Sequence, residues 1–224
     1  MRPAPTYMAD QAIANIDREP RWPALVAMFA AACLYWALPE QLSLGPDWLL
    51  PALIVALLIP TAVSHYGGYH HIDRALMFVA TGLITAAMIA SLVFLVQGLP
   101  HHREAPAVLL RSAAALWITN VLVFALWYWK VDAGGPLSRD RARATPVADL
   151  NSSFLFPQMT GANPVPSWSP QFVDYLFLAF NTSTAFSPTD TAVLSRGAKL
   201  AMMAQSLISL SIIALLAARA INIL

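Results

Sequence analysis

Charged residues and cysteine are both scarce in this chain. Lys, Arg, Asp and Glu make up 11% of its 224 residues, and hydrophobic residues make up 58%. A soluble domain averages about 25% charged residues, so the composition predicts a single membrane domain. The one cysteine, Cys33, excludes an intrachain disulfide framework and a Cys-rich metal site.

Basic tracts and catalytic motifs are missing as well. The net charge is +1 and no cluster of lysines or arginines stands out, so we expect no nucleic-acid partner. The sequence has no nucleophile elbow, phosphate loop or carboxylate pair in a catalytic frame, and we predict neither an enzyme nor a cofactor. Carboxylates are absent from the long apolar runs, which argues against a proton-coupled pump.

Long apolar runs are what the chain has in place of charge. They cover approximately residues 22–38, 48–64, 75–99, 108–129 and 200–218. A helix of about 20 apolar residues crosses the roughly 30 Å hydrocarbon core. The sequence therefore predicts an all-α, multi-pass protein with five transmembrane helices, in the plasma (inner) membrane of a bacterial-type cell and with the lipid bilayer as a partner.

A shorter apolar run, 172–180, precedes the last long one. Ser169 and Pro170 suit the start of a helix. A helix of about 14 residues covers only about 21 Å, so it cannot span the membrane. The polar segment 181–191 follows, and irregular backbone at membrane depth is tolerated only where protein buries it or water reaches it. We expect a re-entrant segment.

The residues of this region resemble a known family. The stretch DYLFLAFNTSTAFSPTD at 174–190, followed by Lys199, Gln205 and residues 217–221, is similar to the pore helix, filter and inner helix of tetrameric potassium-channel-like cation channels. The likeness covers roughly a quarter of the chain, or over a third with the preceding span as outer helix. It implies a homotetramer around a central pore, with inorganic cations as partners.

The filter-like segment also departs from that family. Potassium filters use glycines so that successive carbonyls face the axis. Here Thr184 and Asp190 match the filter threonine and outer aspartate, but the residues between them include no glycine and contain Pro188. We therefore do not predict potassium selectivity for this chain.

Two groups of residues form the predicted pore. The filter residues are Asn181, Thr182, Ser183, Thr184, Ala185, Phe186, Ser187, Pro188, Thr189 and Asp190. Four copies of Asp190 would concentrate cations at the mouth. Gln205, Ser206 and Ser209 could line a cavity, or instead hydrogen-bond between helices. We call the short helix and the polar segment after it, 172–191, the hairpin. In the alternative, the hairpin only packs against the other helices and lines no pore, and Asp190 caps the last helix.

The resemblance also divides the chain. We predict a polar arm over 1–21, a three-helix transmembrane region over 22–107, and a channel-like pore module over 108–224. The module comprises an outer helix 108–130, a turret 131–169, a pore helix 170–184, a filter-like loop 184–191 and an inner helix 194–222. The predicted function is passive cation permeation through a tetramer with an atypical filter. The alternative is a non-conducting structural or interaction membrane protein that keeps the same architecture.

The histidines suggest a second, weaker site. His65, His70 and His71 lie in one loop and could hold a metal or sense protons, although no resident metal is predicted. His101 and His102 are separated from them by the third span, which would place the two groups on opposite membrane faces. A histidine-rich di-iron site is therefore not expected.

The two signals for membrane orientation disagree. With five spans, ten of the lysines and arginines fall on the N-terminal side and three on the other. The positive-inside rule then places Met1 in the cytoplasm. The channel resemblance instead places Leu224 there, and both alternatives stay open at this point.

Overall fold

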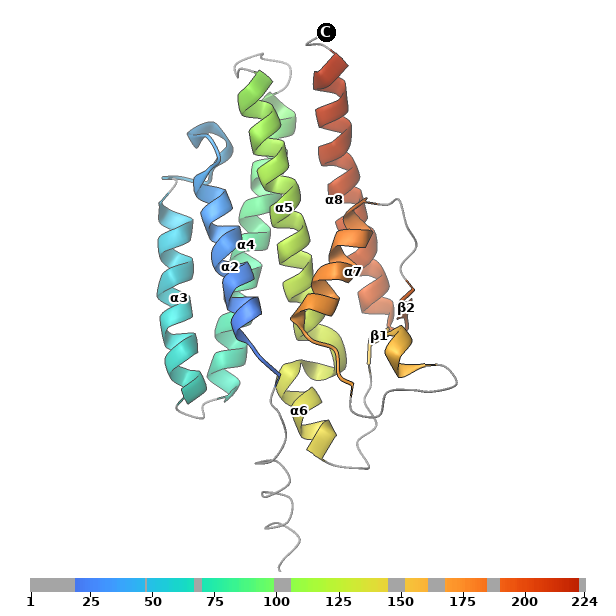
Figure 1. Ribbon diagram of the computed structural model, residues 1–224. Coiled ribbons are helices and arrows are strands. Elements are labelled where there is room, and N and C mark those ends of the chain that lie inside the picture. Colours follow the sequence, from blue (N-terminus) through green and yellow to red (C-terminus); the bar gives the residue numbers. More distant parts are fainter. Residues whose placement is uncertain are drawn as a thin grey trace, which may run out of the picture.

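Helices running side by side make up most of the computed structural model (Figure 1). It describes residues 19–46, 48–66, 70–98, 106–144, 152–160, 168–184 and 190–221. The long helices are α2 (Trp22–Trp36), α3 (Leu49–Tyr66), α4 (His70–Gly98), α5 (Pro106–Val131) and α8 (Arg196–Ile221). Shorter elements are α6 (Pro136–Ala144), α7 (Phe172–Thr184), β1 (Phe154–Leu155), β2 (Ala192–Val193) and 3-10 turns at Glu40–Leu42, Asp132–Gly134 and Pro157–Met159.

Three of these helices are long and apolar enough to cross a membrane. The stretches are Arg74–Gln97, Ala107–Ala142 and Arg196–Ala217, while Trp22–Trp36 and Leu49–Pro60 are shorter apolar helices. The prediction of a helical membrane protein is thus confirmed. The number of transmembrane helices, five, stays a prediction.

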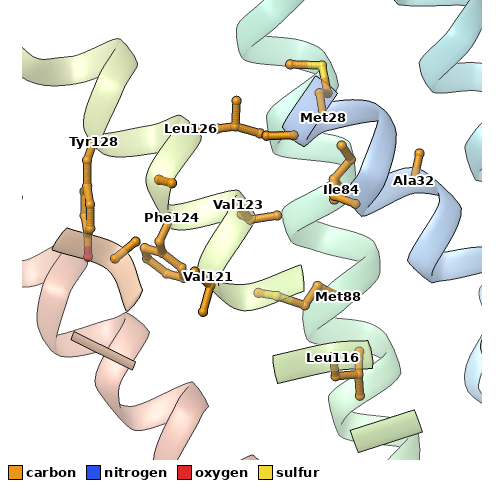
Figure 2. Close-up of a cluster of buried hydrophobic side chains, with 14 of the residues drawn as sticks. Met28, Ala32, Ile84, Met88, Leu116, Val121, Val123, Phe124, Leu126 and Tyr128 are labelled. Carbon is orange, nitrogen blue, oxygen red and sulfur yellow. The ribbon is translucent and has the colours of Figure 1, made fainter. Parts of the chain in front are cut away.

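Helix α5 is the centre of the packing. It contacts α2 and α4 on one side and α7 and α8 on the other. Figure 2 shows Val123 and Leu126 of α5 reaching towards Met28 and Ile84, whereas Tyr128 points away from them towards α8. Because α5 is buried on both sides, it connects the N-terminal helices to the C-terminal module.

The connection after α5 is more structured than the sequence indicated. Ala133, Gly134 and Gly135 have positive φ angles of 51°, 78° and 94°, and they turn the chain into α6. A Cβ on Gly135 would lie 3.0 Å from the Lys130 carbonyl oxygen, so the turn requires glycine there. The predicted turret, 131–169, therefore contains a helix and a strand rather than one plain connection.

Helix α7 enters the molecule and the chain returns to the end where α7 began. Its 13 residues rise beside α5 to about mid-height in Figure 1. A helix of this length covers about 20 Å. β2 then pairs antiparallel with β1, with Phe154 opposite Val193 and Leu155 opposite Ala192. Helix α8 starts beside this pair and runs to the opposite end (Figure 1).

Most of the basic residues gather at the end of the bundle where α7 and α8 begin, which we call the basic end. Among the residues with described side chains, these are Arg21, Arg74, Lys130, Arg139, Arg141, Arg196 and Lys199. Arg111 lies near the opposite end, in the first turns of α5. Seven of the eight basic residues with described side chains thus lie at one end of the bundle.

Candidate functional site

The C-terminal end of α7 lies inside the protein and is capped by side chains from α8. The Ser209 hydroxyl donates to the Ser183 carbonyl at 2.6 Å, and the Ser206 hydroxyl donates to the Thr182 carbonyl at 3.3 Å. Gln205 Nε2 donates to the Ala179 carbonyl at 2.7 Å. The last carbonyls of a helix have no partner within it, and leaving them unpaired in an apolar setting is costly. Helix α8 supplies these missing donors.

A second layer of hydrogen bonds joins α5 to the same point. Tyr128 donates its hydroxyl to Gln205 Oε1 at 2.5 Å, and Gln205 Nε2 also contacts the Ser183 hydroxyl at 2.8 Å. Asn120 Nδ2 lies 3.4 Å from both the Ser183 hydroxyl and the Gln205 carbonyl. We call Asn120, Tyr128, Ser183, Gln205 and Ser209 the mid-bundle network. It fixes three helices to one another where α7 ends.

One acceptor of this network has no partner among the described residues. Asn120 Oδ1 is buried and accepts no hydrogen bond from any residue that the structure describes. A buried amide oxygen in this position can accept a hydrogen bond from water or contact a cation. It lies at the negative end of the α7 dipole, where positive charge is favoured.

The three residues predicted to line a cavity differ in burial. Gln205 and Ser209 are fully buried between α7 and α8, and Ser206 is half-buried. Gln205 and Ser209 therefore face no open surface in the single chain, and their part in a pore stays a prediction. Their polar groups are taken up by the α7 carbonyls, as in the alternative of hydrogen bonds between helices.

The predicted filter residues divide into three groups. Thr182 and Ser183 are buried within the protomer, whereas Asn181 and Thr184 are half-buried. Ala185, Phe186, Ser187, Pro188 and Thr189 lie outside the described residues. Asp190 is exposed near β2. Ser195 caps α8, because its hydroxyl oxygen accepts a hydrogen bond from the Ala198 amide at 3.1 Å. The predicted capping role for Asp190 is thus filled by Ser195.

A buried ion pair ties the N-terminal arm to α6. Arg139 Nε and Nη2 donate to the two carboxylate oxygens of Glu19 at 3.1 and 3.0 Å. Arg139 Nη1 donates to the carbonyls of Trp129 and Asp132, and the Trp129 indole N–H donates to Glu19. Arg139 is 2% exposed and Glu19 is 4% exposed. The predicted polar arm, 1–21, is thus fixed to the bundle at Glu19.

Asp132 links the elements around the start of α7. Its Oδ2 accepts the Tyr175 hydroxyl at 2.6 Å. Its Oδ1 accepts three donors: the Ser152 hydroxyl at 2.9 Å and the amides of Ser153 at 2.6 Å and Phe154 at 3.3 Å. The Arg139 guanidinium lies 5.2 Å from the centre of the Tyr175 ring. These contacts join the end of α5, β1 and α7.

We call Glu19, Trp129, Asp132, Arg139 and Tyr175 the anchor network. It holds the first turns of α7, as the mid-bundle network holds the last turn. Sequence analysis missed it because Glu19, Asp132 and Arg139 were assigned to an arm and a turret. The signal available was the Asp132-Ala-Gly-Gly-Pro136 turn, whose glycines indicate a tight reversal next to a carboxylate.

Lys130 is buried although it lies at the end of an apolar helix. A lysine in such a position commonly extends to the headgroups, but Lys130 is 4% exposed. Its ammonium donates to the Met77 carbonyl and the Thr81 hydroxyl of α4, and it lies 5.6 Å from the centre of the Phe78 ring. Lys130 therefore links α5 to α4.

The alternative metal site cannot be placed. The side chains of His65, His70 and His71 lie outside the described part of the chain. Within the described part, no three His, Cys, Asp or Glu side chains come together to hold a metal ion.

Substitution Gln205→Leu is expected to destabilise the mid-bundle network. It leaves the Tyr128 hydroxyl without its acceptor and removes two donors from the end of α7. A buried unpaired polar group costs about 1–3 kcal/mol, and hydrogen bonds in membranes are at the low end of that range. We expect a loss of about 2 kcal/mol, which lowers the melting temperature in detergent by about 4–8 °C.

The matched control for Gln205→Leu is Ser211→Ala. Ser211 is exposed on the same helix, and its hydroxyl bonds only to the Leu207 carbonyl one turn earlier among the contacts described. Equal melting temperatures for the two variants would show that the network does not hold α8 to α7.

Comparison with family models, with curated proteins and with solved structures finds no match for this chain.

Proposed function

We propose that this chain is a channel-like integral membrane protein whose copies assemble, as a homotetramer, into a pore for passive cation movement. The observation that carries the proposal is the course of the chain around α7. The helix ends inside the protein at Thr184, and the chain is back at the basic end by β2. Such a re-entrant half-helix followed by a full span is the arrangement of a pore module, and outside a pore or protein interior it would leave backbone groups unpaired in lipid.

The charges around the end of α7 favour a cation. The helix dipole places partial negative charge at the C-terminal end of α7. Asn120, whose Oδ1 accepts no hydrogen bond from any described residue, contacts Ser183 at this end. Asn181 and Thr184 are partly exposed there, and the Asp190 carboxylate is exposed further along the hairpin. These oxygens could replace part of an ion's hydration shell. They do not form the glycine-based ring that selects potassium.

Unpartnered apolar faces provide the surface for assembly. Helix α7 exposes Val173, Phe177 and Phe180, which lie on one side of the helix. Helix α8 exposes Leu200, Met203, Leu207, Leu210 and Ile213 on the side away from α7. In a tetramer, neighbouring modules would cover part of these faces, and lipid would cover the rest.

The proposal includes a topology. Helices α2 and α3 cross the membrane together with α4, α5 and α8, which gives five spans. The basic end then faces the cytoplasm by the positive-inside rule. In this arrangement the hairpin enters from the cytoplasmic side, opposite to the side that the channel resemblance implies.

Cation flux into liposomes tests the function. We expect the wild-type chain to pass monovalent cations, and Asp190→Asn to reduce the flux by about tenfold at low ionic strength and by less at high salt, because screening weakens its attraction for cations. Phe186→Gly, which shortens a bulky side chain in the filter-like loop, is expected to raise the flux. Glu40→Gln is the control, since Glu40 is an exposed carboxylate in the turn after α2, at the opposite end from the hairpin.

A non-conducting structural or interaction protein is the second candidate. It is favoured by one observation: Gln205, Ser206 and Ser209 use their polar groups to cap α7. A folded, reconstituted wild-type protein that passes no cation would support this candidate. A monomer in mild detergent would contradict the tetramer.

A further inference from the structure

A pocket of about 110 Å³ opens at the basic end between α4, the end of α5 and α6. A water molecule requires on the order of 10–15 Å³ of such space, so the pocket has room for a small polar group. Four cationic residues line it: Arg21, Arg74, Lys130 and Arg141. None of the described residues lining it is acidic.

The remaining walls combine an aromatic ring with a tight turn. The Phe78 ring lies 5.7 Å from the Arg74 guanidinium carbon and 5.6 Å from the Lys130 ammonium. Cations at this distance from a ring are held by its negative face. Residues 134–138, from the glycine turn to the first turn of α6, form the other wall. Lys130 also lines the pocket, and its ammonium is held by bonds to α4.

Three described carboxylates belong to the elements around the pocket, but none of them lines it: Glu19, Asp132 and Asp140. Glu19 and Asp132 belong to the anchor network. Asp140 Oδ1 accepts the Glu19 amide at 3.2 Å. Among the described residues, the lining of the pocket is therefore electropositive.

We propose that this pocket binds a phosphate group, carried by an anionic phospholipid of the leaflet at the basic end. Its position fits a headgroup, because it lies where the apolar stretch of α4 begins at Arg74 and where Trp129 ends the apolar part of α5. Basic pockets between membrane helices attract anionic headgroups, and each lysine or arginine near the surface contributes about 1 kcal/mol. The site is separate from the α7–α8 hairpin, so it does not depend on ion conduction.

Displacement of fluorescent phosphatidylglycerol from the purified full-length protein in detergent tests the site. Unlabelled phosphatidylglycerol should displace it, while phosphatidylcholine should not. Inorganic phosphate, added against chloride at equal ionic strength, distinguishes the two sources: displacement by phosphate at low concentration would assign the site to free phosphate. Arg74→Gln and Arg141→Gln should each weaken binding about fivefold, and Arg74→Lys should restore most of the loss.

Arg111→Gln is the matched control, because Arg111 is exposed near the opposite end of α5. The proposal is overturned if phosphatidylcholine competes as well as phosphatidylglycerol while phosphate has no effect. It is also overturned if Arg111→Gln weakens binding as much as Arg74→Gln. The melting temperature of each variant without lipid shows whether it is folded. If Arg74→Gln is misfolded, Arg74→Lys tests the site instead, because it retains the positive charge.

Discussion

Asp132→Ala is expected to be strongly destabilising. The carboxylate accepts four donors, from Tyr175, Ser152, Ser153 and Phe154. Each buried donor left unpaired costs about 1–3 kcal/mol, although water that enters the space would recover part of this. We expect a loss of about 3–5 kcal/mol in the free energy of unfolding, which lowers the melting temperature by about 10 °C or more.

Asp132→Asn separates the loss of hydrogen bonds from the loss of charge. The amide oxygen of asparagine can still accept from Ser152, Ser153 and Phe154, so this variant should lose about 1 kcal/mol. Thermal unfolding followed by tryptophan fluorescence measures both variants. If Asp132→Ala unfolds at the same temperature as Asp132→Asn, the carboxylate does not organise the start of α7.

Arg139→Ala is expected to have an effect of similar size for a different reason. The substitution leaves the Glu19 carboxylate buried without its bidentate partner. Removing one member of a buried ion pair costs about 3–5 kcal/mol, mostly because the remaining charge is uncompensated. Replacing Glu19 with Gln in the same chain should therefore recover part of the loss.

Arg111→Ala serves as the control for Arg139→Ala. Arg111 is exposed, and surface substitutions usually change stability by less than about 0.5 kcal/mol. If the Glu19→Gln/Arg139→Ala double variant is less stable than Arg139→Ala alone, Glu19 finds another partner in the single variant.

The losses of stability in Asp132→Ala and Arg139→Ala should not be additive, because both residues belong to one network.

The anchor and mid-bundle networks together explain how a short helix is held inside the bundle. Tyr175, in the first turn of α7, bonds to Asp132, and Ser183, in the last turn, bonds to Gln205 and Ser209. A helix of 13 residues gains little stability by itself. Fixed at both ends, α7 keeps a set position relative to α5 and α8, which the proposed pore requires.

The sequence by itself determined the class and the approximate positions of the apolar helices. Long apolar runs of little charge form helices because the bilayer leaves the backbone few other ways to pair its polar groups. The predicted pore helix, 170–184, and the observed α7, Phe172–Thr184, differ by two residues at one end, because the apolar run and the N-terminal signals are local.

Only the tertiary structure decided which polar side chains pair with one another. Glu19 and Arg139 are 120 positions apart in the chain, and Tyr128 and Gln205 are 77 apart. Their pairing depends on which helix faces lie together, and helical periodicity in a uniformly apolar span does not mark a face. For the same reason, the sequence left two roles open for Gln205 and Ser209, cavity lining and hydrogen bonding between helices, and the structure places both against the α7 carbonyls.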